Sequence, residues 1–261
     1  MFYTLSEYLS KNSDDSSLTP LNSPLIILRH DVEARYENAL RFAEIQHHLG
    51  IHGSYYFRLF PKPGNTEIIK KIADLDHEIG YHYDDLSYCK GDYEKVITRF
   101  QQNLAFLREI APVQTICMEG APGSKYNNQD LWEKYDYHDF GITSEPYFDL
   151  DFNAIYYLTD TGRRWDGKFS VRDKPFWGQG EKETKRQGDK ETKRQGEEYM
   201  KLRFRHTRDI VKAVEEGSFP NQAMLTFHPQ RWNDKPWSWL KELVWQNVKN
   251  QGKRFLLKLR G

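Results

Sequence analysis

The chain has 261 residues, enough for one large domain or two small ones with a hydrophobic core. Lysine plus arginine and aspartate plus glutamate each number 38, so the formal net charge is zero. This balance argues against a nucleic-acid-binding protein, which needs a basic surface. The two cysteines, Cys89 and Cys117, stand in unrelated contexts and indicate neither a disulfide scaffold nor a zinc site made of cysteines.

The first ten residues lack the basic and apolar regions of a secretory signal. No apolar run approaches the roughly 18 residues that a membrane-spanning helix requires. We therefore expect no membrane span and a cytoplasmic location. The sequence carries no indication of the oligomeric state.

Residues 1–24 are predicted to form a short helix and a connector rich in Ser, Asp, Asn and Pro. From residue 25 onward, apolar runs alternate with amphipathic segments. The predicted strands are 25–29, 52–58, 78–82, 113–118, 140–143, 154–158, 222–227 and 255–259. The predicted helices are 36–49, 65–75, 93–110, 129–135, 208–216 and 236–250.

Alternating strands and helices predict an α/β fold with parallel strands and right-handed crossovers. About seven such units favour a closed (β/α) barrel over an open sheet. We predict a single barrel domain over residues 25–261. It is interrupted at about 178–198 by a nearly perfect eight-residue repeat, EKETKRQG followed by DKETKRQG, which has no apolar residue and is expected to be disordered.

Ionisable residues follow four of the predicted strands. The carboxyl ends of parallel strands lie at one pole of a barrel, so these residues are expected to converge there. The four groups are His30, Asp31 and Glu33; His82 with Asp84 and Asp85; Glu119; and His228. Imidazoles and carboxylates together suit a divalent metal such as zinc. Such an ion acidifies water and polarises a carbonyl, while a nearby carboxylate and histidine act as base and acid, so the pattern predicts a hydrolase.

The order of these motifs resembles the polysaccharide deacetylase (NodB-homology, carbohydrate esterase 4-like) superfamily. The resemblance is carried by HDVE at 30–33, EIGYHYDDL at 78–86 and FHPQRW at 227–232. The stretches GSKYNNQDLW and YLTDTGRRWDG are similar to a divergent bacterial subgroup. The resemblance implies a distorted (β/α) barrel that removes an N- or O-acetyl group from a sugar or glycan precursor, with a divalent metal, zinc by expectation.

The resemblance also implies roles for individual residues. Asp31 and Glu33 match the first acidic motif, as ligand and base in an order left open, and His228 matches the late-strand acid. Asp160 and Trp165 match the region that orients this histidine. The expected metal ligands are Asp31, Glu33, His82, His30 and Asp85. The expected substrate-binding residues are Glu119, Asp160, Arg163, Trp165, Arg231 and Trp232.

The sequence departs from the H-x-x-x-H motif of the family, because Leu86 stands four residues after His82. Asp84, Asp85 or His30 is expected to supply the missing ligand. Glu119 stands where the family contacts substrate or oxyanion, and a carboxylate there repels an oxyanion. Two alternatives therefore stay open: a catalytically impaired carbohydrate-binding protein, and a metal-free glycosidase that uses Glu33 with Glu119.

Overall fold

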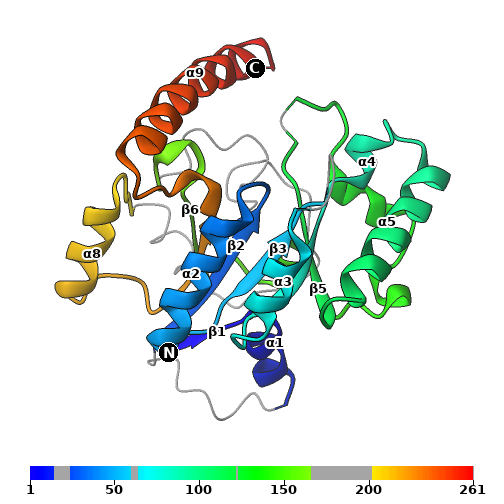
Figure 1. Ribbon diagram of the computed structural model, residues 1–261, viewed down its shortest axis with the longest axis horizontal. Coiled ribbons are helices and arrows are strands. Elements are labelled where there is room, and N and C mark those ends of the chain that lie inside the picture. The colour runs from blue at the N-terminus through cyan, green and yellow to red at the C-terminus, as the bar shows by residue number, and fades with distance from the viewer. Residues whose placement is uncertain (15–23, 60–63, 122, 166–201, 261) are drawn as a thin grey trace.

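The computed structural model describes residues 1–14, 24–59, 64–121, 123–165 and 202–260 (Figure 1). The strands are β1 (Phe2–Tyr3), β2 (Leu25–Val32), β3 (Ser54–Phe57), β4 (Glu78–Tyr83), β5 (Val113–Met118), β6 (Tyr156–Thr159) and β7 (Gln222–Phe227). The α-helices are α1 (Leu5–Asp14), α2 (Tyr36–His48), α3 (Thr66–Ala73), α4 (Asp85–Tyr88), α5 (Tyr93–Arg108), α6 (Pro146–Asp149), α8 (Thr207–Glu215) and α9 (Pro236–Arg260). The 3₁₀ helices are η1 (Asn128–Glu133), η2 (Tyr137–Phe140), η3 (Thr161–Arg163) and η4 (Pro229–Arg231).

The strands form one seven-stranded sheet in the order β5-β4-β3-β2-β7-β6, with β1 beside β2. Each pair of neighbouring strands in this sheet is parallel. An isolated bridge between Thr115 and Ser144 extends the sheet beyond β5, toward the chain segment that precedes β6. The predicted α/β fold with parallel strands is confirmed; among the described strands, the two edges β5 and β6 do not pair with each other.

Strand β2 lies near the centre of the sheet because its first residues, Leu25-Ile26-Ile27-Leu28, can be buried on both faces. It pairs with β7 from Leu25 to His30 and with β3 from Arg29 to Val32. Helices α2 and α3 cover one face, and α5 packs beside β4 and β5 (Figure 1). Successive side chains of a strand point to opposite faces, so Arg29 and Asp31 share the face opposite to that of His30.

Two predicted strands are wrong. Residues 255–259 belong to α9, which continues to Arg260. Their short apolar run suits a helix as well as a strand. Residues 140–143 do not form a strand, because Gly141 has a left-handed φ of 68° that turns the chain after η2. The repeat at about 178–198, which is predicted to be disordered, lies outside the described residues.

None of the described helices, the long α9 included, is long and apolar enough to cross a membrane. The buried apolar side chains of the described residues form a large cluster rich in aromatic rings and a second, smaller cluster around β6 and α8. Trp132 of η1, for example, makes edge-on contacts with Tyr83 and Phe100. Tyr83 is the last residue of β4, so this packing holds that end of the strand in place.

Candidate active site

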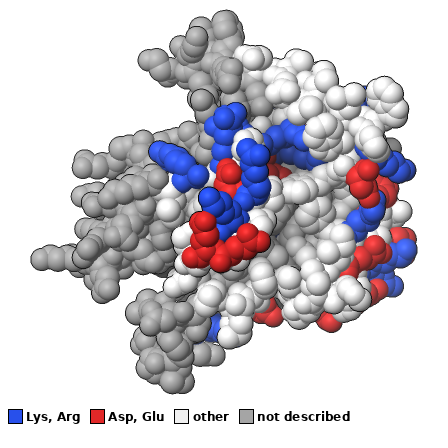
Figure 2. Space-filling model, turned by 90° about the vertical axis from the view of Figure 1, so that its left-hand side faces the viewer, with Lys and Arg blue, Asp and Glu red and all other residues white. Residues whose placement is uncertain are grey.

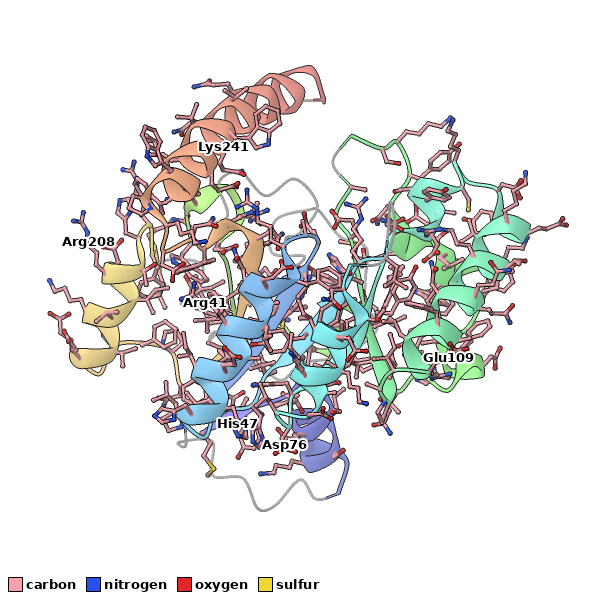
Figure 3. The ribbon with its side chains drawn as sticks, viewed as in Figure 1. Arg41, His47, Asp76, Glu109, Arg208 and Lys241 are labelled. Atoms are coloured by element: carbon pink, nitrogen blue, oxygen red, sulfur yellow. The ribbon has the colours of Figure 1, made fainter. Side chains whose placement is uncertain are left out.

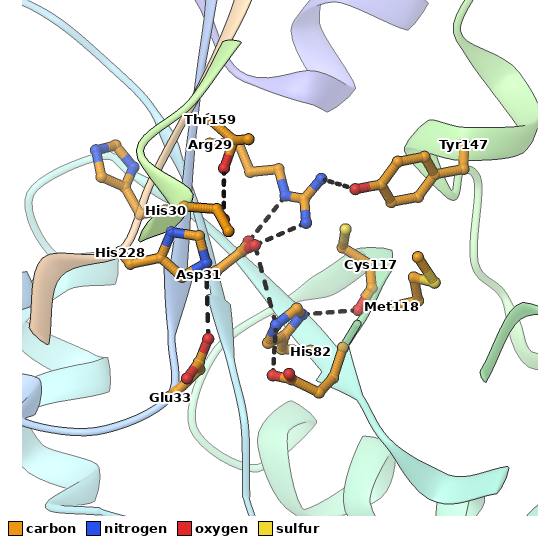
Figure 4. A network of polar contacts seen from close by, with 12 residues as sticks. Arg29, His30, Asp31, Glu33, His82, Cys117, Met118, Tyr147, Thr159 and His228 are labelled. Carbon is orange, nitrogen blue, oxygen red and sulfur yellow. Dashed lines mark hydrogen bonds and ion pairs between the residues drawn. The ribbon is translucent and has the colours of Figure 1, made fainter. Parts of the chain in front are cut away.

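Asp31, near the end of β2, is held by Arg29 on the same face of the strand (Figure 4). The Arg29 Nε donates to Asp31 Oδ1 at 2.8 Å, and Nη2 donates to Oδ2 at 2.7 Å. A third nitrogen, Nη1, donates to the hydroxyl of Tyr147. Both charged side chains are almost fully buried. Burial alone would lower the pKa of Arg29, but the charge of Asp31 raises it well above its ordinary value. The pair is therefore fixed in one geometry.

His82, in β4, presents one ring nitrogen to the carboxylates. Its Nδ1 lies 3.0 Å from the carbonyl oxygen of Cys117, which can only accept, so Nδ1 carries the proton. Its Nε2 lies 3.2 Å from Glu119 Oε2 and 4.0 Å from Asp31 Oδ2. Burial opposes the charged ring, but Asp31 and Glu119 together raise the pKa of His82 to about 9. These carboxylates favour the protonated ring of His82.

Glu33, just after β2, and Glu119, just after β5, bring two carboxylates to His82. Burial, and then the negative charge of Glu119, raise the pKa of Glu33. Burial has the same effect on Glu119, but contact with His82 outweighs it and lowers the pKa of Glu119. Glu119 Oε2 is buried and accepts no hydrogen bond of good geometry from the described residues, although His82 Nε2 is near. Glu33 and Glu119 thus bring two carboxylates to one side of His82, and a cation there would be held by both charges.

One ligand atom each from Glu33, His82 and Glu119 lie within 4.8 Å of one another. A second trio, Asp31, His82 and Cys117, meets the same distance limit. Both trios need His82 Nε2, since Nδ1 is bonded to a carbonyl, so one ion can use only one of them. Because Arg29 already binds both oxygens of Asp31, the trio with Glu33 and Glu119 is the better fit for a divalent cation.

His228 and Asp160 form the opposite wall. The His228 Nδ1 lies 2.5 Å from Asp160 Oδ1, and the backbone amide of His228 donates to Oδ2. Asp160 also accepts from Trp232 Nε1 at 2.7 Å and from Arg231 Nη1 at 3.2 Å. Burial raises the pKa of Asp160, but His228 and Arg231 outweigh burial and lower it. The other ring nitrogen of His228 is aimed at Glu33, with Nε2 3.6 Å from Oε1. This wall exists because β6 and β7 are neighbours.

The structure thus brings together Asp31, Glu33, His82, Glu119, Asp160 and His228, with Arg231 and Trp232 attached to Asp160. The other two predicted substrate-binding residues, Trp165 and Arg163, contact residues outside this group. The buried Trp165 packs edge-on against Phe227, and its indole donates to Thr207. The guanidinium of Arg163, on η3, lies 4.9 Å over the ring of Trp239.

His30 does not join the proposed ligand set. Its side chain points to the other face of the sheet, away from His82 (Figure 4). There it stacks on Tyr55 at 4.0 Å, with Nδ1 3.1 Å from the carbonyl of Ser54 and Nε2 2.9 Å from Gln46. Burial lowers the pKa of His30 to about 3. Both ring nitrogens are used, and His30 is a neutral core residue.

Asp85 does not join it either. Asp85 begins α4, where its carboxylate accepts from Tyr81 at 2.8 Å and from Arg99 at 2.5 Å. Arg99 also donates to Asp84, whose second oxygen accepts from Arg58 Nε. Asp84 and Asp85 therefore fasten α4 and α5 to the end of the sheet. They provide no replacement for the second histidine of the motif.

Sequence reasoning did not assign a role to Arg29 or Arg58. Arg29 offered a signal, because a charged residue two positions before Asp31 in a buried strand shares its face. Arg58 follows β3, and its positive charge interacts with carboxylates of the site. Burial lowers the pKa of Arg58, but the negative charges of Glu119 and Asp84 outweigh burial and raise it. No local pattern marks Arg58, since its neighbours come from β4 and β5.

Comparison with solved structures finds proteins of the CE4 family. The matches include a CE4 family pseudoenzyme from Bacillus anthracis (TM-score 0.45, 12% identity, 90% of this chain and 63% of that one). They also include PdaA of Bacillus subtilis, a family 4 carbohydrate esterase (0.45, 13%, 94% and 83%). A third is the Xyl-CE4 domain of a multidomain xylanase from the hindgut metagenome of Trinervitermes trinervoides (0.44, 12%, 88% and 85%).

These neighbours are described as members of the CE4 family, which the sequence motifs also resemble. The chain spans less than two thirds of the length of the Bacillus anthracis protein. No protein-family model matches the chain, and no curated protein matches it. Because the identities are 12–13% and the TM-scores are below 0.5, these neighbours assign no function to the chain. Its function is inferred from the residues of the site.

Proposed function

We propose that the chain is a metal-dependent hydrolase that removes an N- or O-acetyl group from a sugar or glycan precursor. The observation that supports this most is the convergence of Glu33, His82 and Glu119, whose ligand atoms lie within 4.8 Å of one another. They lie next to the Arg29-held Asp31 and opposite the Asp160-held His228. Such a set contains a cation site, a base and an acid.

Glu33, His82 and Glu119 would hold the cation. One imidazole and two carboxylates are a donor set that zinc accepts in catalytic sites, and their two negative charges balance a divalent ion. Glu119 thereby takes the position left open by the incomplete H-x-x-x-H motif. When bound, the ion would polarise the acyl carbonyl and acidify water.

The remaining residues would move the protons. Asp31 accepts a proton from the attacking water, and Arg29 keeps its oxygens in place for this. His228 donates a proton from Nε2 to the leaving nitrogen or oxygen of the sugar, while Asp160 fixes the tautomer through Nδ1. Trp232 is about one third exposed and offers a ring face beside Asp160 on which a sugar can pack.

Metal analysis of the purified chain, combined with acetate release from N-acetylated hexosamine oligosaccharides and O-acetylated sugars, tests the proposal. We expect a stoichiometric divalent ion and acetate release that chelator abolishes and zinc restores. Glu119→Gln should lose both, while Glu94→Gln, an exposed glutamate on α5, should lose neither. Both substitutions remove one carboxylate charge, so they differ in position alone.

Two results would favour the other hypotheses. Glycan binding that survives chelator, without acetate release, would indicate a carbohydrate-binding protein. Chelator-resistant cleavage of a glycosidic bond, lost in Glu33→Gln and in Glu119→Gln, would indicate a metal-free glycosidase. The close approach of these carboxylates makes that second result worth testing.

A further inference from the structure

Helix α9 exposes apolar side chains to solvent and buries polar ones. A helix that packs on a protein core does the opposite. Trp237, Leu240, Val244 and Val248, at spacings of three and four, form an apolar stripe that is in solvent. Trp239 and Trp245 lie off this stripe and are also exposed, at 43% and 56%. The exposed fractions are 82% for Trp237, 42% for Leu240, 58% for Val244 and 57% for Val248. Among the side chains of α9 that the structure describes, the two that are buried, Glu242 and Gln246, are polar and lie on the opposite face. The described part of the protein therefore leaves the apolar stripe in solvent.

The charged residues in the sequence of α9 are almost all of one sign. All but one of the charged residues in its sequence are Lys or Arg, the exception being the buried Glu242. Lys241 is exposed and lies on this helix, which extends outward from the sheet (Figures 1 and 3). Helix α8 provides a contrast within the same chain. On α8, Arg208 contacts Asp209 and Lys212 contacts Glu216, so both signs lie side by side on that face (Figure 2).

We propose that α9 is an interfacial anchor that binds the surface of an anionic lipid bilayer. The exposed stripe of Trp237, Leu240, Val244 and Val248 would enter the boundary between headgroups and acyl chains, and the exposed Lys241 of the same helix would contact anionic headgroups. Tryptophan suits this boundary because its ring is apolar and its N–H is polar. Two copies of α9 would repel each other through their like charges, whereas an anionic surface attracts the helix.

This anchor joins the body next to the candidate active site. Helix α9 contacts η3, where Arg163 lies over the ring of Trp239, and η3 directly follows Asp160. The helix is too polar to span a membrane, so the binding would be peripheral. The inference depends on the faces of α9 alone and stands whether or not the chain is a hydrolase.

Flotation of the full chain with lipid vesicles tests the proposal. The vesicles are phosphatidylcholine alone, or phosphatidylcholine with about 30 mol% phosphatidylglycerol. We expect at least about tenfold stronger binding to the anionic vesicles, with most of it lost in about 0.5 M NaCl. The double variant Val244→Glu/Val248→Glu should reduce binding to the anionic vesicles at least about tenfold. The control Val211→Glu/Val214→Glu places the same charges at exposed valines of α8 and should bind like the parent.

Far-UV circular dichroism and the melting temperature of each variant establish that the chain stays folded, so that lost binding reports on the exposed face. The proposal is overturned if the parent binds neutral and anionic vesicles equally or binds neither. It is also overturned if the parent is a stable dimer that the α9 variant dissociates while vesicle binding is absent. In that case the apolar face of α9 is a contact between two copies of the chain.

Discussion

The Nε2 atom of His82 lies 3.2 Å from Oε2 of Glu119, across the gap between the ends of β4 and β5. This contact joins a residue that the sequence motif marks as a ligand to one that the motif does not. Under the proposed function, Glu119 would replace the missing second histidine of the motif as a ligand. The charges of His82, Glu119 and Glu33 are the basis for the expected pH dependence and metal affinity of the site.

Substitutions of Glu119 should distinguish a ligand from a bystander. We expect Glu119→Ala to weaken zinc binding on the order of 100-fold or more, because it removes one of three ligands. Glu119→His should retain zinc, since it supplies an imidazole in place of the carboxylate. Zinc affinity measured by competition with a chromogenic chelator checks both. Equal affinity in the parent and in Glu119→Ala would contradict the proposed ligand set.

The raised pKa of His82 predicts a pH-dependent stability of the metal-free chain. The folded pKa of about 9 exceeds the ordinary value of 6.5, so the contribution is complete below about pH 6.5 and disappears as the pH rises through 9. A shift of this size corresponds to about 3 kcal/mol. Urea unfolding at several pH values between these limits, compared with His82→Gln, measures it. We expect the variant to show the smaller decline, and parallel curves would contradict the assignment.

Zinc binding should release a proton over the same pH range. His82 must lose its proton before Nε2 can bind a metal, so the apparent affinity should rise with pH up to about 9. Calorimetric titration in buffers of different ionisation enthalpy counts the released protons. We expect close to one proton per ion at neutral pH. No release would indicate that His82 is already neutral or is not a ligand.

Asp160→Asn should reduce catalysis and leave metal binding intact. The amide can no longer stabilise the protonated ring of His228, so kcat should fall roughly 10²- to 10⁴-fold. Zinc content should not change, because Asp160 is not in the proposed ligand set. Steady-state kinetics and metal analysis on the same preparation provide the test. A loss of zinc with activity would instead give Asp160 a structural role.

Arg29→Met should destabilise the fold by about 3–5 kcal/mol, because it leaves the buried Asp31 carboxylate without its cation. The double variant Arg29→Met/Asp31→Asn removes both charges and should recover part of this loss. Urea unfolding of the parent, the two single variants and the double variant gives the coupling energy. A coupling energy near zero would show that the two side chains do not depend on each other.

The sequence predicts the parts of the site that depend on position within a strand. The alternation of side chains in β2 places Arg29 with Asp31 on one face and His30 on the other. The expectation that His30 joins the ligands overlooked this alternation. The role of Glu119 could not be predicted, because it depends on β4 and β5 being neighbours in the sheet. The strand predicted at 255–259 was wrong for a related reason: a short apolar run does not reveal whether it extends a preceding helix.

The order of strands in the sheet has one more consequence. The trio Glu33, His82 and Glu119 is supplied by segments that follow or lie within β2, β4 and β5, and β3 separates β2 from β4. No hairpin or other local fragment can reproduce this grouping, so an ion held by the proposed trio would need the folded chain. If the trio binds zinc, metal occupancy and the folding equilibrium would be linked thermodynamically, and bound zinc would report the fraction of native protein in a preparation.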